Sequence, residues 1–521
     1  MPRRSFLATC LALACTAGPA AALAQAAPHA HAARQHGRHV LLISVDGLHA
    51  SDLARYTADH PTSALAGLSD RGTTYSNALS SFPSDSFPGL LALVTGGTPK
   101  STGVYYDDSY DRSLYKPGSN CTGTPGTEVD YSEAIDRNPN ALDAGGGIDP
   151  AKLPQAKQGA HCVPVYPHSF LRVNTIFNVA RKAGLRTAWS DKHPSYDLVN
   201  GPSGHGVTDL YTPEIAANKT TGSVTATEAY DALKVRAILN QIGGRNSTGS
   251  RSAPTPAIFG MNFQSVSVAQ KLPFNGSPDI GGYEPGGEDF TAQLDGALSN
   301  VDAHIAKMVA GLDRRGLLDS TQIIITAKHG QAPKDPTQHV RISGDTIPGI
   351  VTTAGAPPAQ ATQDDVALLW LADQSTTGQA SAALSADQQG ADTAHIHRVI
   401  DGPELNTLFG DPLRDPRVPD VVVQPEQGVV YSSSTKKVAE HGGGAPDDRQ
   451  VALLVADGRV RGGPGGVYDP ASDGSGGRTV DQPVSTTQVA PSILRYLRLR
   501  PADLQAVGTE GTRPLPGSGA R

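Results

Sequence analysis

Two apolar runs in the sequence end in residues that could hold a cation or a phosphoryl group. Asp46 closely follows the run at 40–45, and Lys328 and His329 follow the run at 323–326. Functional side chains of α/β proteins gather where strands end, and carboxylate and imidazole groups are common metal ligands. For each residue taken singly, the alternative is a capping Asp, a salt-bridged Lys or a buried structural His.

Ser86 stands in the segment Ser-Phe-Pro-Gly, directly before an apolar stretch. Pro88 suits the first turn of a helix, which places Ser86 at the helix N-terminus. Free N–H groups and the helix dipole favour an alkoxide or a phosphate at that position. Ser86 is therefore expected where a developing alkoxide or a bound phosphate is favoured, and a plain helix N-cap is the alternative.

The elements that must position these residues are indicated by alternating patterns. Apolar, β-branched runs are typical of strands buried on both faces of a parallel sheet, and they occur at 40–45, 187–189, 258–261, 323–326, 421–423 and 451–455. Helical periodicity lies between them, at 175–182 and 294–317. We expect an α/β fold, a three-layer α/β/α sandwich with a mostly parallel central sheet.

One long segment interrupts this pattern. Residues 106–168 are rich in Gly, Pro and Asp and have no sustained periodicity, so we expect an inserted cap there within a catalytic domain at 38–516. The cap contains Cys121 and Cys162, which we expect to pair in an oxidising compartment.

The first residues have the pattern of an export signal. Arg3 and Arg4 precede an apolar stretch, and small residues precede position 26, so we expect a signal peptide at 1–26 and a flexible leader at 27–37. The paired arginines resemble the twin-arginine signal, and an ordinary Sec signal stays open. Both predict a periplasmic or extracellular protein. No other apolar run approaches the ~18 residues of a membrane span.

The charge of the chain argues against one class of partner. The formal net charge is −7, and it becomes two units more negative if Arg3 and Arg4 leave with the signal. An acidic chain is poorly suited to bind nucleic acid or an anionic membrane. We expect a small-molecule ligand instead.

Several motifs, in the same order along the chain, resemble the type I phosphodiesterase/nucleotide pyrophosphatase family of the alkaline phosphatase superfamily. These motifs are ISVDG around Asp46, FPSDSFP around Ser86, VTGGTPKSTGV after it, TAKHG around His329 and EHGG around His441. The resemblance covers most of the chain beyond the leader and implies the alkaline phosphatase fold.

The resemblance also implies roles for these residues. Ser86 becomes the nucleophile that forms a phosphoserine intermediate. Asp46, Ser86, His329 and His441 become ligands of a divalent cation, most simply Zn²⁺, with one or two ions bound. The substrate would be a phosphate ester or a nucleotide-like molecule.

The sequence departs from the family pattern at three places. Lys328 stands where a metal-binding Asp is usual, so we expect its ammonium to supply part of the missing metal charge and to stabilise the phosphoryl oxygens. The segment 262–271, which should supply the second metal's Asp and His, contains neither residue type. Gly89 stands where relatives often have an Asn donor, which leaves the backbone N–H near Phe87 for that contact.

Two further residues are candidates for binding the substrate. Lys192 and His193 follow a predicted strand and could contact the substrate or its leaving group, and a capping cluster between strand and loop is the alternative.

The sequence thus favours an exported, metal-dependent phosphoric ester hydrolase of the phosphodiesterase or nucleotide pyrophosphatase type. Two alternatives remain open: a sulfate-ester or phosphonate hydrolase of the same fold, and a relative that binds a phosphate ligand without turnover.

Overall fold

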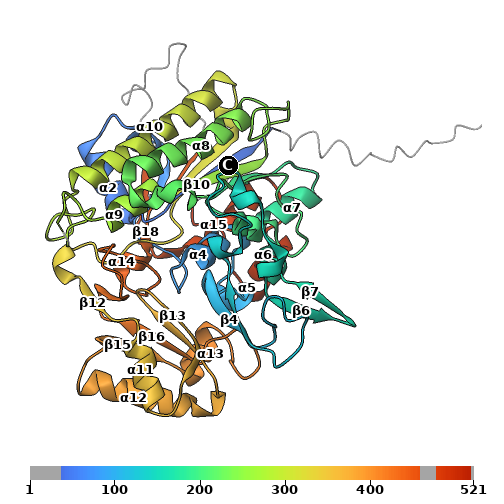
Figure 1. The fold of residues 1–521 in the computed structure, drawn as a ribbon. Coiled ribbons are helices and arrows are strands. Elements are labelled where there is room, and N and C mark those ends of the chain that lie inside the picture. Colours follow the sequence, from blue (N-terminus) through green and yellow to red (C-terminus); the bar gives the residue numbers. More distant parts are fainter. Residues whose placement is uncertain (1–36, 278, 458–476, 518–521) are drawn as a thin grey trace, which may run out of the picture.

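The central sheet has eight strands and lies between two layers of helices (Figure 1). The computed structural model describes residues 37–277, 279–457 and 477–517, so the expected signal peptide and nearly all of the expected leader lie outside it. The strand order across the sheet is β20 (Arg478–Val480), β2 (Thr73–Tyr75), β19 (Leu453–Asp457), β11 (Thr321–Thr326), β1 (His39–Val45), β10 (Ile258–Phe263), β8 (Ala188–Ser190) and β9 (Asp209–Tyr211).

The sheet is mostly parallel. β1 pairs in parallel with both β10 and β11, while β19 is antiparallel to its neighbours β11 and β2. All seven residues of β1 are buried, because helices cover both faces of the sheet. The predicted α/β/α sandwich is confirmed.

Alternate residues of β1 enter different cores. Leu41 and Ile43 pack in the core under α8 (Val224–Ile242), α9 (Ser265–Lys271) and α10 (Ala292–Arg314). Val40 and Leu42 pack in the opposite core with α4 (Ser86–Thr95), α7 (Ile176–Lys182) and α15 (Val489–Tyr496). The period of two along a strand thus anchors it to both helix layers.

A second, separate sheet lies at the far end of the molecule (Figure 1). Its four antiparallel strands occur in the order β13 (Pro358–Gln363), β14 (Ala367–Leu371), β16 (Val421–Pro425) and β15 (Ile396–Ile400). α11 (Thr346–Thr353) and α12 (Thr377–Gln389) share its core. The run at 421–423 was expected in the central sheet, and this placement is wrong, since apolar character alone does not say which sheet a buried strand joins.

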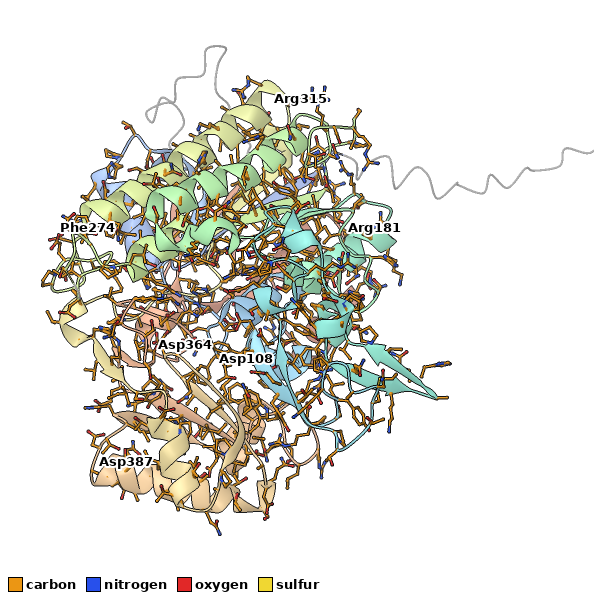
Figure 2. All side chains as sticks on the ribbon, in the orientation of Figure 1. Asp108, Arg181, Phe274, Arg315, Asp364 and Asp387 are labelled. Carbon is orange, nitrogen blue, oxygen red and sulfur yellow. A yellow bond between two sulfur atoms is a disulfide. The ribbon has the colours of Figure 1, made fainter. Side chains whose placement is uncertain are left out.

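Segment 106–168 consists mainly of loops and two small hairpins. β4 (Asp108–Asp111) pairs with β5 (Thr127–Asp130), and β6 (Gln155–Gln158) pairs with β7 (His161–Pro164). The expected disulfide between Cys121 and Cys162 is present. Side chains fill the space between these parts and the two sheets, with Arg315 and Asp387 at opposite ends of the molecule (Figure 2).

Candidate active site

Polar residues lie at the carboxyl ends of three neighbouring strands of the central sheet. Ser44 of β1 is level with Asn262 of β10 and with Thr326 of β11. Asp46 follows β1 closely, and Lys328 and His329 follow β11, so the parallel register brings these side chains together.

Ser86 begins α4, and its neighbours hold it against the sheet. The N-cap residue Asp85 accepts a hydrogen bond from the Phe87 N–H at 2.9 Å. A Cβ atom on Gly89 would lie 2.2 Å from the Lys328 carbonyl oxygen, so only glycine allows the helix to come this close. The missing Asn of the family pattern therefore has a steric explanation in this chain.

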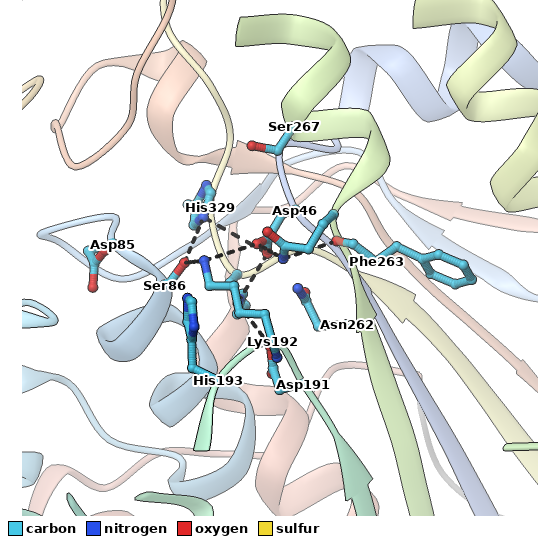
Figure 3. A network of polar contacts seen from close by, with 12 residues as sticks. Asp46, Asp85, Ser86, Asp191, Lys192, His193, Asn262, Phe263, Ser267 and His329 are labelled. Carbon is cyan, nitrogen blue, oxygen red and sulfur yellow. Dashed lines mark hydrogen bonds and ion pairs between the residues drawn. The ribbon is translucent and has the colours of Figure 1, made fainter. Parts of the chain in front are cut away.

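The Ser86 hydroxyl faces two nitrogen atoms (Figure 3). Its Oγ lies 3.3 Å from His329 Nε2 and accepts a hydrogen bond of 3.3 Å from the Lys192 ammonium. These two partners stand 243 and 106 residues away in the sequence. A base and a cation thus flank one buried hydroxyl.

The His329 ring is oriented by its other nitrogen. Nδ1 lies 2.7 Å from the Gly330 carbonyl oxygen, which only accepts hydrogen bonds, so Nδ1 carries the proton and Nε2 presents a lone pair to Ser86. Burial, together with the nearby Lys328 charge, lowers the pKa of His329 to about 3. The imidazole is therefore neutral at physiological pH, and its Nε2 is free to accept a hydrogen bond from the Ser86 hydroxyl.

His441 packs directly on this ring. The centroids of His329 and His441 lie 3.9 Å apart, and His441 Nδ1 is buried without a hydrogen-bond partner among the described residues. Burial and the neighbouring His329 hold the pKa of His441 well below its usual value. The structure thus brings His441 to the site as an uncharged side chain.

Asp46 is surrounded by donors and cations. Its Oδ1 lies 3.3 Å from the Lys328 ammonium, and its Oδ2 lies 3.9 Å from the Lys192 ammonium and accepts a hydrogen bond from the Gln264 amide. Burial would raise the pKa of Asp46, but these cations outweigh it and hold the pKa well below its ordinary value. Asp46 is a permanent carboxylate.

The Lys328 side chain is fully buried yet has partners on several sides. It donates to the Tyr196 hydroxyl at 2.9 Å and lies 3.9 Å from Asp191 Oδ1. Asp191 is also fully buried and accepts from the Trp189 indole at 3.0 Å. These contacts fix the ammonium at one place beside Asp46.

The segment expected to hold a second cation is engaged in hydrogen bonds instead. Gln264 donates to Asp46, and Gln270 Nε2 donates to the Gly47 carbonyl and the Tyr283 hydroxyl, both at 2.9 Å. The backbone N–H groups of Gln264 and Ser265 donate to the buried Asp231 carboxylate. This segment supplies amide donors to the neighbourhood of Asp46.

Two residues expected to contact the substrate, Phe87 and His193, bind other groups of the protein instead. The Phe87 N–H is used by the Asp85 cap, and its ring packs edge-on against Tyr196, so it does not offer a free donor. His193 Nδ1 lies 2.8 Å and 2.9 Å from the two carboxylate oxygens of Glu214. The His193 ring is thus held by a buried carboxylate, whereas the Lys192 ammonium reaches Ser86.

The residues present do not fit the metal centre that the resemblance implies. Among the residues that the structure describes, no group of three or more His, Cys, Asp or Glu side chains is arranged to hold a metal ion. Of the expected ligands, Asp46 and His329 lie near Ser86, and His441 packs on His329. The Lys328 ammonium stands 3.3 Å from Asp46 Oδ1, the oxygen that lies 3.9 Å from His329 Nε2, and would repel a dication there. These side chains therefore do not present the three converging ligands that a protein zinc site uses.

Two residues of the site were not identified as candidates in the sequence. Asp191 directly follows β8, as Asp46 closely follows β1, so the rule of strand ends could have indicated it. Tyr196 lies in a short 3-10 helix and gives no such signal, because an aromatic residue after a Pro is compatible with ordinary packing.

Comparisons with known proteins agree with this architecture. Residues 40–447 match the sequence profile of the family described as type I phosphodiesterase / nucleotide pyrophosphatase. A bovine (Bos taurus) protein described as bis(5'-adenosyl)-triphosphatase ENPP4 is 21% identical over 322 residues, which cover 62% of this chain and 54% of the bovine protein. The chain thus matches about half the length of that relative.

Two solved structures of the murine ectonucleotide pyrophosphatase / phosphodiesterase 5 (ENPP5) have a similar fold, one of them an inactive variant in complex with AMP. Each has a TM-score of 0.55 and 14% identity, and the match covers 89% of this chain and 95% of the murine chain. The family is one of phosphoric ester hydrolases and is generally metal-dependent. With more than half of its length matched by the family profile, the chain belongs to the type I phosphodiesterase / nucleotide pyrophosphatase family.

Proposed function

We propose that this chain hydrolyses phosphate esters, of the phosphodiester or nucleotide pyrophosphate type, through a phosphoserine intermediate on Ser86. One observation carries the proposal: the Ser86 hydroxyl, at the N-terminus of α4, lies 3.3 Å from both a neutral imidazole nitrogen and an ammonium group. A hydroxyl between a base and a cation has the surroundings of an activated nucleophile.

In the first half of the reaction, Ser86 Oγ attacks phosphorus and passes its proton to His329 Nε2. The bond from phosphorus to the leaving oxygen breaks, and that oxygen keeps the electron pair and takes a proton from solvent. The Lys192 and Lys328 ammonium groups stabilise the charge on the phosphoryl oxygens. In the second half, water attacks the phosphorus bound to Ser86, which in the case of a diester still carries its second ester group, and gives a proton to solvent. The bond from phosphorus to Ser86 Oγ breaks, Oγ recovers its proton from His329, and the phosphate monoester is released.

A nucleotide-like substrate is supported by the relatives, since one is described as a bis(5'-adenosyl)-triphosphatase and another as a complex with AMP. We further propose export to the periplasm or the exterior, on the strength of the pattern at residues 1–26. Among the described residues, none of the helices combines the length and the hydropathy of a membrane span.

A panel of chromogenic esters tests the proposal. We expect bis-(p-nitrophenyl) phosphate to be cleaved faster than p-nitrophenyl phosphate and p-nitrophenyl sulfate. Acid quenching during turnover of the diester should trap one p-nitrophenyl phosphoryl group on Ser86, detected by mass spectrometry of the peptide. Faster cleavage of the sulfate would favour the sulfatase alternative. Binding of phosphate without hydrolysis of any ester would favour a binding protein.

A further inference from the structure

We propose that the phosphoryl group in this site is held and polarised by the ammonium groups of Lys192 and Lys328, with no divalent cation taking part. The inference rests on the proposed function and replaces the expected zinc centre with two fixed organic cations. The side chains that surround Ser86 in this chain do not fit the metal requirement of the family.

Lys328 has the position and the burial of a structural cation. Its ammonium lies 3.3 Å from Asp46 Oδ1 and donates to Tyr196, whose ring centroid lies 4.9 Å from the same nitrogen. The side chain has no exposed surface. A charge fixed in this way needs no reorganisation when a phosphoryl group arrives, which is the condition for strong electrostatic stabilisation.

Lys192 occupies the other side of the same carboxylate. Its ammonium lies 3.9 Å from Asp46 Oδ2 and donates to Ser86 Oγ at 3.3 Å. The side chain is 17% exposed, unlike that of Lys328, so a substrate can reach it. The two lysines therefore flank Asp46 as two cations would, one buried and one at the nucleophile.

The segment that should ligate the second metal is closed to a cation. The Gln264 amide points an N–H donor at Asp46 Oδ2, and a donor at this place repels a positive ion. The remaining carboxylate oxygen is the one next to Lys328. Asp46 Oδ1 accepts no hydrogen bond from the described residues, but the Lys328 ammonium beside it would repel a metal, and Oδ2 faces the Gln264 donor.

Asp46 faces both lysines, and Asp191 lies on another side of the buried Lys328 ammonium. An isolated cation is strongly disfavoured inside a protein, whereas a cation paired with carboxylates is tolerated. In this chain Asp46 thus pairs with two lysines. The chemical class of the ligand stays that of a phosphate ester.

Metal removal from the unmodified protein is the direct test. Purified full-length protein is analysed for metals by plasma mass spectrometry before and after dialysis against a strong chelator, and the binding of orthovanadate, a phosphoryl analogue, is measured by calorimetry in both states. We expect less than about 0.1 metal per chain and the same vanadate Kd within about 2-fold. Vanadate binding that disappears on chelation and returns with Zn²⁺ would overturn the inference.

A pair of variants tests whether the Lys192 ammonium contributes to vanadate binding. Lys192→Met is expected to weaken vanadate binding by at least about 10-fold, while Lys182→Met, which removes an exposed charge from α7, leaves it unchanged. Thermal melting reports whether each variant folds, and an unchanged Kd in a folded Lys192→Met protein contradicts the role of Lys192.

Hydrolysis of bis-(p-nitrophenyl) phosphate separates this inference from the proposed function. Hydrolysis that requires added zinc would support the proposed function and contradict the inference. An absence of hydrolysis with and without zinc would contradict the proposed function, and the vanadate measurement would still decide whether the two lysines act without metal.

Discussion

Two buried ion clusters lie close together in this protein, and they are built differently. In one, Asp231 accepts hydrogen bonds from two backbone N–H groups and lies 3.0 Å from the Lys234 ammonium, which donates to the Asn262 carbonyl. In the other, Lys328 and Lys192 stand 3.3 Å and 3.9 Å from the oxygens of Asp46.

The two clusters differ in how completely their charged groups are hydrogen-bonded and shielded from solvent. The Asp231–Lys234 pair has no exposed surface and ties α8 to the start of α9, as expected of a structural ion pair. The Asp46 cluster contains Asp46 Oδ1, which has no hydrogen-bond partner among the described residues, and a lysine that reaches solvent. The Asp46 cluster therefore keeps hydrogen-bonding capacity and solvent access beside the nucleophile, whereas the Asp231–Lys234 pair has neither.

The largest expected effect concerns the nucleophile in the Asp46 cluster. Ser86→Ala should lower kcat for bis-(p-nitrophenyl) phosphate by at least about 10⁴-fold, because loss of a nucleophile removes the covalent pathway. Steady-state kinetics measure this change, and the melting temperature should stay within a few degrees. Ser250→Ala, at an exposed loop position, is the control and should keep wild-type kinetics.

Substitution in the Asp231–Lys234 cluster should instead lower the stability of the protein. Lys234→Met leaves the Asp231 carboxylate buried without its cation, which should lower the free energy of unfolding by about 3–5 kcal/mol. Denaturant unfolding followed by circular dichroism measures the loss. Arg236→Gln, at an exposed position of the same helix, should change it by no more than about 0.5 kcal/mol. A loss below about 1 kcal/mol in Lys234→Met would remove the contrast between the two clusters.

A glycine substitution tests how tightly packing fixes the Asp46 cluster. Gly89→Ala places a Cβ 2.2 Å from the Lys328 backbone oxygen, so α4 or the Lys328 segment must move. We expect a loss of about 1–3 kcal/mol in stability together with a fall in kcat.

The matched control for that substitution is Gly296→Ala in α10. A Cβ at this position meets nothing within 4 Å, and alanine in a helix interior should stabilise the protein by about 0.5–1 kcal/mol. Wild-type stability and kinetics in Gly89→Ala would contradict the close approach of helix and strand end.

The smallest effect concerns a third buried group, the acid pair next to the His441 loop. Burial raises the pKa of Asp448 to about 7, and burial together with Asp448 raises the pKa of Asp365 well above its ordinary value. The folded state therefore binds more protons than the unfolded state, whose Asp pKa is near 3.9. This contribution is fully present below about pH 4 and is lost as the pH rises through about 7.

Asp448→Asn should flatten this dependence, by up to about 1.4 kcal/mol per pH unit, while its amide oxygen still accepts the Gly443 N–H. Unfolding measured at intervals from pH 4 to pH 8 gives the slope. Asp313→Asn, at an exposed position of α10, provides the reference slope. A variant slope equal to that of the wild type would show that Asp448 is not held protonated.

The sequence by itself was enough to place the fold and part of the site. Buried strands bear a local signature in their apolar runs, and strand ends bear another in Asp46, Lys328 and His329, so both could be predicted. The motif before Pro88 likewise indicated that Ser86 begins a helix, which α4 confirms.

Only the tertiary structure decided how Ser86 is surrounded. The contact of Lys192 with Ser86 joins residues that lie 106 positions apart, and no local pattern encodes such a distance. The same holds for the amide of Gln264 at Asp46 and for the separate sheet that contains the run at 421–423. Local periodicity determines which residues are buried and in what element, whereas long-range packing determines which charges meet, and the chemistry of this site depends on the second.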